Sequence, residues 1–99
     1  MKFDVVVEKR AIEDIQEAID YYNIQKAGLG KKFEQEVDKY LNTLVKTPLF
    51  QIRYKNVRGL PLKKFPFMIH FSVDNEIETV LVHAVLHTSE NPDNWNSRA

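Results

Sequence analysis

Two charged segments carry residue types that could do chemistry. The first lies between positions 53 and 64 and contains five cations and no acid: Arg53, Lys55, Arg58, Lys63 and Lys64. Clustered cations attract phosphate groups, and one arginine can hold two phosphate oxygens at once. The second segment, residues 13–20, contains four acids and no base: Glu13, Asp14, Glu17 and Asp20. The net charge is zero, but the charges are therefore distributed unevenly.

The three histidines, His70, His83 and His87, could act as acids or bases near neutral pH. We do not expect them to share a metal ion. On a strand that rises about 3.3 Å per residue, His83 and His87 would stand roughly 13 Å apart. In the register expected below, His70 faces Thr79 and not His83. The chain has no cysteine, so neither a disulfide nor a thiolate metal site is expected. We also expect no cofactor.

Length and composition are those of one small globular domain. The 99 residues are 43% hydrophobic and 11% aromatic, which fits a single domain over residues 1–99. The chain has no apolar run long enough to span a membrane as a helix. It also lacks a leader-like segment at its N-terminus, so a cytoplasmic protein is expected.

The first half of the chain predicts a short strand followed by two helices. Residues 3–7 are apolar and β-branched, as in a strand. From about Lys9, apolar residues recur at helical spacing in two runs: Ile12, Ile15, Ile19 and Tyr22, then Phe33, Val37, Tyr40, Leu41 and Leu44. Gly28 and Gly30 should end the first helix, because glycine adopts the left-handed conformation at little cost. Pro48 limits the second helix, so the two runs predict a helical hairpin.

The second half predicts four strands, at residues 51–57, 60–65, 67–73 and 77–86, with a turn at Gly59. A two-residue turn at Asp74 and Asn75 would pair Val73 with Glu76 and Ile69 with Val80. The apolar positions would then share the face that packs on the helices: Phe67, Ile69, Phe71, Val73, Val80, Val82, Ala84 and Leu86. The opposite face would be mixed and open: Met68, His70, Thr79, Leu81, His83, Val85 and, at the strand end, His87. We therefore predict an α+β fold of order β-α-α-β-β-β-β, with the helical hairpin on one face of an antiparallel sheet.

An ordered series of motifs runs through nearly the whole chain. The first helix has the form Ala-x-x-Asp-Ile-x-x-Ala-x-x-Tyr-Tyr, which starts at Ala11 and ends at Tyr22. The later motifs are Leu29-Gly30-x-x-Phe33, Leu44 before Pro48, Val57-Arg58, Phe65-Pro66-Phe67, Val85-Leu86-His87, Pro92 and Trp95. In this order and spacing, the motifs resemble the RelE/ParE toxins, especially the branch known as plasmid-stabilisation proteins.

The resemblance implies a cytoplasmic bacterial toxin that is neutralised by an antitoxin encoded beside it. RelE-like members cleave messenger RNA on the ribosome without a metal, whereas ParE-like members inhibit DNA gyrase. The branch usually ends in His-x-x-Arg-x-Pro, but in this chain Glu90 occupies the arginine position after His87. This departure removes a cation that would bind phosphate, and it weakens the nuclease interpretation.

Metal-free RNA cleavage needs a base for the 2′-hydroxyl, cations for the phosphate and an acid for the leaving oxygen. In a nuclease, Arg58 would hold the phosphate and His87 would serve as acid or base. The backbone of the nucleic acid would be bound by Arg53, Lys55, Lys63 and Lys64, and Trp95 would stack on a base. The alternative is that the cations only solvate an edge strand and that His87 only closes a strand.

Three functions therefore remain open at this stage. The chain could be a ribosome-dependent endoribonuclease, a gyrase inhibitor without chemistry of its own, or an attenuated toxin that mainly binds its antitoxin. The acidic segment of the first helix is expected to be solvated. Alternatively, it could bind basic residues of the antitoxin.

Overall fold

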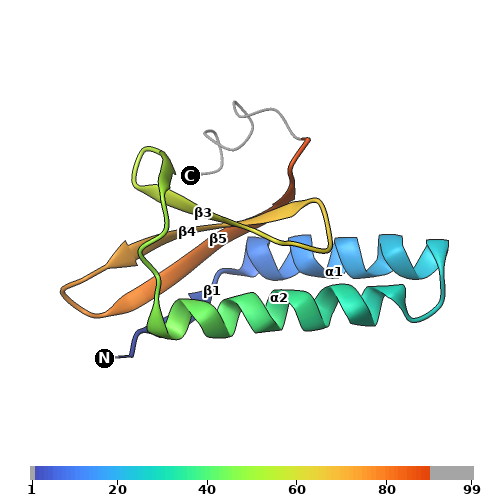
Figure 1. The fold of residues 1–99 in the computed structure, drawn as a ribbon, viewed down its shortest axis with the longest axis horizontal. Helices are drawn as coiled ribbons and strands as arrows, with labels where there is room; N and C mark the ends of the chain where they lie inside the picture. Colours follow the sequence, from blue (N-terminus) through green and yellow to red (C-terminus); the bar gives the residue numbers. More distant parts are fainter. Residues whose placement is uncertain (1, 90–99) are drawn as a thin grey trace.

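The computed structural model describes residues 2–89, and in it two helices lie side by side on one face of a five-stranded sheet (Figure 1). The elements in chain order are β1 (Asp4–Val7), α1 (Lys9–Gln25), α2 (Leu29–Lys46), β2 (Ile52–Tyr54), β3 (Val57–Pro61), β4 (Phe67–Asp74) and β5 (Thr79–His87). This order confirms the α+β arrangement predicted from the sequence. Neither helix is long and apolar enough to cross a membrane within the described residues.

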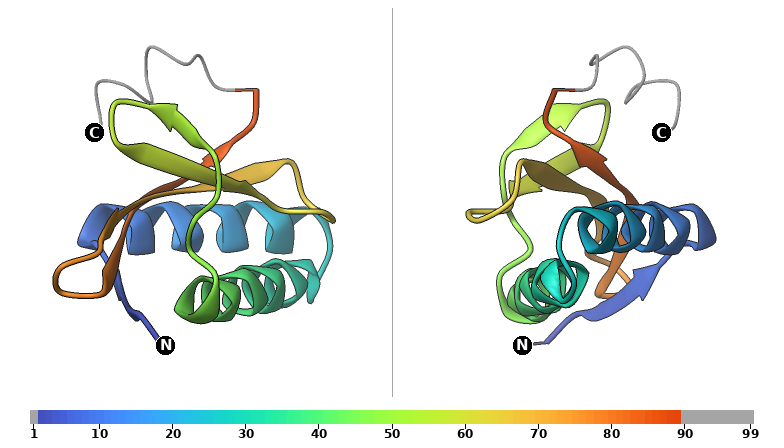
Figure 2. Two further views of the ribbon diagram at one scale, coloured as in Figure 1. Left: turned by 60° about the vertical axis from the view of Figure 1, so that its left-hand side comes forward. Right: turned by 90° about the vertical axis from the view of Figure 1, so that its right-hand side faces the viewer.

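The strands are ordered β1-β5-β4-β3-β2 across the sheet. The last four strands of the chain form antiparallel pairs with their neighbours in sequence, as expected. β1 is the exception, because it runs parallel to β5 and forms one edge of the sheet. The two helices connect β1 to the rest of the sheet and cover a single face, as the rotated views show (Figure 2). The opposite face, called the open face below, carries no helix formed by residues 2–89.

Alanines let α1 lie close to the sheet. Ala11, Ala18 and Tyr22 are its buried residues, at the spacing of one helical stripe. Ile15 and Ile19 pack beside them, but Ile12 is 54% exposed. The prediction that Ile12 belongs to the apolar stripe is therefore wrong, because it lies one residue, or about 100° around the helix, from Ala11. For α2 the prediction is confirmed, since Phe33, Val37 and Leu44 are buried.

The two glycines of the helical hairpin have different roles. Gly28 has the expected left-handed conformation, with a φ of 88°, but it is the N-cap of α2, because α1 already ends at Gln25 with Lys26 as its C-cap. Gly30, however, lies inside the first turn of α2, where a Cβ atom would come 2.5 Å from the carbonyl oxygen of Ile19. Its N–H also donates a hydrogen bond to Asn23 Oδ1 at 2.9 Å. Gly30 is thus required by the close approach of the two helices.

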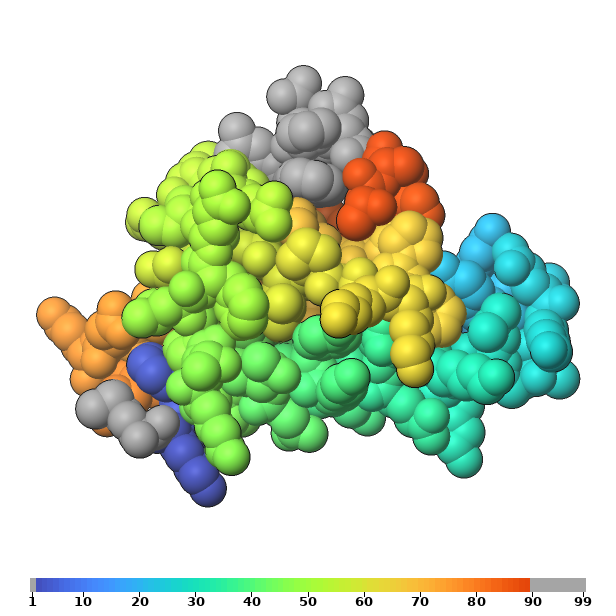
Figure 3. All heavy atoms as spheres, viewed as in Figure 1, coloured from blue at the N-terminus to red at the C-terminus, as the bar shows by residue number. Residues whose placement is uncertain are grey.

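An aromatic cluster fixes the β3–β4 loop to the helices. The ring of Tyr22 lies 5.0 Å from that of Phe65, and the ring of Phe33 lies 5.0 Å from that of Phe67. Edge-to-face pairs of this kind add to the free energy gained by burial of the rings. The buried carboxylate of Glu36 on α2 accepts a hydrogen bond from the backbone N–H of Lys64 at 2.6 Å. Accordingly, the β3–β4 loop, drawn in yellow, lies against α2 (Figure 3).

The turn between β2 and β3 differs from the prediction. The chain reverses at Lys55 and Asn56, where Lys55 has a φ of 47°. Gly59, predicted as a turn, lies inside β3 opposite His70. A Cβ atom at Gly59 would meet the side chains of Met68 and Arg53. This glycine therefore makes room for neighbouring side chains, and the predicted strands 51–57 and 60–65 are both displaced.

The register of the β4–β5 hairpin also corrects the prediction. Asp74 pairs with Thr79 and Val73 with Val80, so the connection is longer than Asp74 and Asn75 alone. The carboxylate of Asp74 accepts hydrogen bonds from the N–H groups of Glu76 and Ile77, and these stabilise the longer turn. The expected pairs of Val73 with Glu76 and Ile69 with Val80 are therefore wrong.

A β-bulge at His83 reverses the faces of the second half of β5. Phe71 pairs with Val82 and His70 pairs with Ala84, so His83 is left without a register partner on β4. Val85, predicted on the open face, consequently belongs to the core beside the helices. Ala84 and Leu86, predicted to face the helices, pair with His70 and Met68 on the open face. Ile69 and His70 still lie on opposite faces.

The bulge leaves one backbone donor of β5 facing α1. The N–H of Val85, whose residue is 1% exposed, donates a hydrogen bond to Asp14 Oδ2 at 3.1 Å. β1 pairs with β5 only as far as Val82, so beyond that point α1 takes the place of a neighbouring strand. Asp14 therefore acts as a structural acceptor for the sheet.

Candidate functional site

Arg58 lies on the helix-covered face of the sheet. It pairs with Phe71, a residue of the core, and cross-strand partners share a face. Its Nη1 donates a hydrogen bond of 2.7 Å to the carbonyl oxygen of Phe50, in the segment that leads from α2 to β2. The residue is half-buried. The guanidinium group is thus used to hold this segment against β3.

His87 also lies on the helix-covered face, as a consequence of the bulge. It pairs with Phe67, and the two ring centroids are 5.2 Å apart. The residue borders a groove of about 280 Å³ whose other wall is α1, including Asp14, Glu17 and Tyr21. The prediction that His87 continues the open face is therefore wrong.

The structure does not bring Arg58 and His87 to one place. Their partners on β4, Phe71 and Phe67, are four residues apart, and β3 and β5 lie on opposite sides of β4. At about 3.3 Å per residue and about 4.8 Å between strands, their Cα atoms are separated by roughly 16 Å. A single phosphate group could not contact both side chains in this conformation.

The remaining predicted cations occupy separate parts of the surface. Arg53 lies over Gly59 on the open face, whereas Lys55 belongs to the β2–β3 turn. Lys63 and Lys64 are exposed in the β3–β4 loop. Trp95 and Glu90 lie outside the described residues, so their proposed roles remain predictions. The basic segment is therefore spread along the β3 and β2 edge of the sheet and the β3–β4 loop.

The acidic residues of α1 fall into two groups. Glu13, Glu17 and Asp20 are exposed, and Asp20 accepts a hydrogen bond from Gln16 at 3.0 Å. Asp14 instead turns toward β5 and accepts the N–H of Val85. Sequence periodicity did not distinguish Asp14 from its neighbours, because the need for an acceptor arises only from the bulge on β5.

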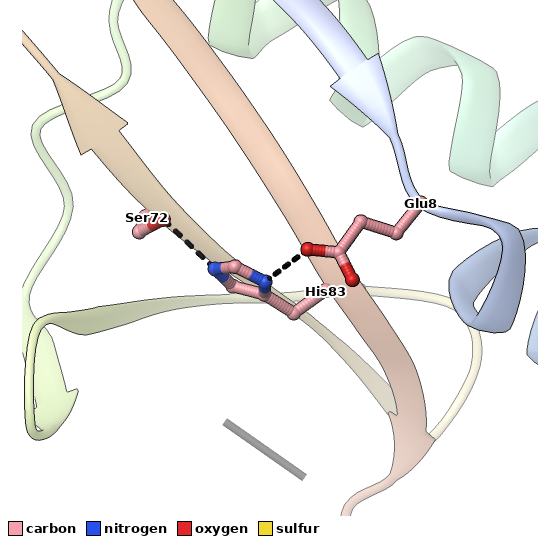
Figure 4. Close-up of polar contacts among 3 residues, drawn as sticks. All are labelled: Glu8, Ser72 and His83. Atoms are coloured by element: carbon pink, nitrogen blue, oxygen red, sulfur yellow. Dashed lines mark hydrogen bonds and ion pairs between the residues drawn. The ribbon is translucent and has the colours of Figure 1, made fainter.

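The open face brings together polar side chains that the sequence patterns left unassigned. Tyr54 Oη lies 3.1 Å from His70 Nδ1, and His70 is 0% exposed. Farther along the sheet, His83 lies between Ser72 and Glu8, with hydrogen bonds to both (Figure 4). The alternation of residues predicted the open-face position of the two histidines, but their partners come from other strands. Within the described residues, no group of three histidine or carboxylate side chains could hold a metal ion.

Comparison with known proteins gives a family match over most of the chain. Residues 5–92 match the family described as ParE toxin of type II toxin-antitoxin system, parDE. No curated protein has a sequence that matches this chain.

Solved structures share the fold at low sequence identity. One chain of a structure titled chromosomal ParDE TA system from P. aeruginosa superposes with a TM-score of 0.79 at 16% identity, covering 89% of this chain and 98% of that chain. A mutant of the E. coli toxin RelE in the free state gives a TM-score of 0.73 at 16% identity, covering 100% and 95%. The RelBE2 toxin-antitoxin complex from Mycobacterium tuberculosis gives 0.63 at 14% identity, covering 88% and 99%.

The order of the elements, the helix-covered sheet and the family match over residues 5–92 lead to the same assignment. The RelE/ParE resemblance inferred from the motifs is confirmed. The chain belongs to the ParE family of toxins from type II toxin–antitoxin systems.

Proposed function

We propose that this toxin inhibits DNA gyrase by binding to it and does not itself cleave RNA. The observation that carries the proposal is the separation of Arg58 from His87. A metal-free nuclease needs its phosphate-binding cation and its acid or base at the same phosphate. In this chain Arg58 binds the Phe50 carbonyl, and His87 lies against Phe67.

The charge of the chain supports binding without RNA chemistry. Net charge is zero, and Arg53 and Arg58 lie on opposite faces of the sheet. Affinity for RNA relies strongly on clustered cations that replace the counterions of the phosphates. The ParE family assignment points in the same direction, because ParE-like toxins are the gyrase inhibitors of the superfamily.

Induced expression without an antitoxin tests this proposal in cells. Plasmid supercoiling and the 5′ ends of messenger RNA should be read from the same culture. We expect relaxed or broken plasmid with intact message. New cuts within translated codons, with normal supercoiling, would refute the proposal. Unimpaired growth with the protein present would favour an attenuated toxin.

A second candidate function is RNA cleavage from the open face, and one observation favours it. Arg53 lies on the same face as the Tyr54–His70 pair, which places a cation near a histidine. The proposed contacts of Lys55, Lys63, Lys64 and Trp95 with nucleic acid belong to this candidate. Arg53→Ala would then abolish the cuts in messenger RNA, whereas Lys46→Ala, an exposed cation at the end of α2, would leave them unchanged.

The partner of the toxin is expected to be an antitoxin. Solved structures that share this fold include toxin–antitoxin complexes from E. coli and M. tuberculosis. We propose that basic antitoxin residues contact the exposed acids Glu13, Glu17 and Asp20. Exposed ion pairs weaken with salt. Glu17→Lys should therefore reduce antitoxin affinity more at low salt than at high salt, and equal affinity at both would exclude this face from the contact.

A further inference from the structure

Three side chains form an unbroken hydrogen-bonded chain across the open face (Figure 4). Ser72 Oγ on β4 lies 2.8 Å from His83 Nε2 on β5. His83 Nδ1 lies 2.7 Å from Oε1 of Glu8, which stands at the start of α1. The side chains of His83 and Glu8 are 18% and 39% exposed, so reagents in solution can approach them.

The fold itself places these residues next to one another. Leu81 pairs with Ser72, so His83, two residues farther along β5, is the diagonal neighbour of Ser72 on the same face. Glu8 lies beside His83 because its N–H donates to the carbonyl oxygen of Val82 at 3.0 Å. Glu8 is the N-cap residue of α1, but its side chain makes no capping hydrogen bond. The carboxylate instead contacts the histidine.

The direction of the hydrogen bonds follows from the chemistry of the groups. A carboxylate can only accept, so Nδ1 of His83 carries the proton that is donated to Glu8. Nε2 then presents its lone pair to the Ser72 hydroxyl. This is the arrangement in which a histidine can remove the proton of a serine while a carboxylate orients the ring.

A groove beside Ser72 offers room for a substrate. Its volume is about 710 Å³, and its lining includes Val6, Leu81 and Ile77. Val6 is 49% exposed and Ile77 is 66% exposed, so the groove presents apolar surface to solvent. Asn56 belongs to the same lining and provides an amide donor for a negatively charged oxygen. Asp74, Asn75, Glu76 and Thr79 also line the groove. Most of its accessible surface is nevertheless apolar, which suits a short aliphatic acyl chain.

We propose that Ser72 is an activated nucleophile that accepts the acyl group of short-chain carboxylic esters, an activity separate from inhibition of the toxin's target. Ser72 Oγ attacks the carbonyl carbon while His83 Nε2 takes the hydroxyl proton. The ester C–O bond breaks, and the alcohol leaves with that proton. Water then attacks the acyl-serine while His83 takes one of its protons. The acyl–Oγ bond breaks, His83 returns the proton to Ser72 Oγ, and the carboxylic acid leaves. Glu8 stabilises the imidazolium ion in both steps.

The chain contains an internal control for this proposal. Ser89 Oγ lies 2.7 Å from His87 Nδ1, which makes a second serine–histidine pair. Both residues of that pair are close in sequence, and in the part of the chain that the structure describes the hydrogen bonds of His87 Nδ1 go to Ser89 and not to a carboxylate. If the carboxylate-oriented histidine activates the serine, Ser72 should react and Ser89 should not.

A fluorophosphonate probe tests the proposal on the full chain. Mass spectrometry should find one adduct, on Ser72, and hydrolysis of p-nitrophenyl butyrate should be blocked by it. Ser72→Ala should abolish labelling, and Ser89→Ala should leave its rate unchanged. His83→Gln and Glu8→Gln should each slow labelling at least about 100-fold, as removal of a triad member does in hydrolases.

The pH profile and the folding of each variant separate activation from a structural role. General-base activation makes the labelling rate of the unmodified chain depend on pH, and Glu8→Gln should change this profile. Far-ultraviolet circular dichroism and thermal unfolding verify that each variant is folded. A folded chain with no adduct on Ser72, equal labelling of Ser72 and Ser89, or a rate independent of pH would overturn the proposal.

Discussion

Asp14 provides the sharpest test of how the sheet and α1 are joined. Its carboxylate accepts the N–H of Val85, which is buried at the bulge. Asp14→Ala leaves this donor without its acceptor inside the protein. Hydrogen bonds to charged groups contribute about 1.5–3 kcal/mol, and leaving a buried donor unsatisfied costs a similar amount. Because Asp14 is half-buried, we expect the lower part of this range, about 1.5–2 kcal/mol.

Thermal unfolding measures the effect directly. For a domain of this size, a loss of 1 kcal/mol lowers Tm by roughly 4–8 °C, so Asp14→Ala should lower it by on the order of 10 °C. Asp14→Asn keeps an acceptor oxygen and should recover part of the loss. Glu13→Ala, at an exposed acid in the preceding position, should change stability by less than about 0.5 kcal/mol. Equal Tm values for Asp14→Ala and Glu13→Ala would refute the assignment of Asp14 as a structural acceptor.

Three further predictions concern other contacts. Gly30→Ala brings a Cβ atom against a backbone oxygen and should cost about 2–3 kcal/mol in urea unfolding. Gly28→Ala is strained only by its φ of 88° and should cost about 1 kcal/mol. Identical denaturation midpoints for the two variants would be inconsistent with this packing. Burial and then Tyr21 raise the pKa of Tyr22. The raised pKa stabilises the fold below pH of about 10, and this contribution is lost as pH rises further. Tyr22→Phe should therefore reduce the alkaline fall in Tm, and an unchanged fall would show that Tyr22 is not its source. Arg58→Ala should lower stability by about 1–2 kcal/mol yet retain gyrase inhibition at temperatures where it is folded; loss of inhibition in the folded variant would place Arg58 at the target.

Much of the fold follows from local sequence patterns. The helical period of α2, with Phe33, Val37 and Leu44 on one stripe, predicts both the helix and its buried face. The alternation along β4 predicts that Ile69 and His70 lie on opposite faces. These patterns are informative because one face of each element is buried in the core.

Features that depend on contacts between distant segments did not follow from the patterns. The bulge at His83 reverses the faces of Val85 and His87, and no local sequence pattern marks it. Gly59 was predicted as a turn, although its small size is required by Met68 and Arg53 across the sheet. A glycine signals tight space as well as tight turns, and only the tertiary structure shows which one applies.

In the candidate site, too, local patterns predicted less than the contacts between distant segments determine. The sequence located the cations of the basic segment, but it did not predict that Arg58 binds the Phe50 carbonyl. The chain of Ser72, His83 and Glu8 joins residues that are as many as 75 positions apart. Spacing along the sequence cannot predict such a group, because the register of β4 and β5 and the position of β1 together determine it.

Inhibition of gyrase by the purified toxin tests the central proposal most directly. Toxin, freed of antitoxin, is added to DNA gyrase, ATP and relaxed plasmid, and the supercoiled product is measured against toxin concentration. The separation of Arg58 and His87 and the ParE family match lead us to expect dose-dependent loss of supercoiling that added antitoxin reverses. Full supercoiling in the presence of excess folded toxin would contradict the proposal.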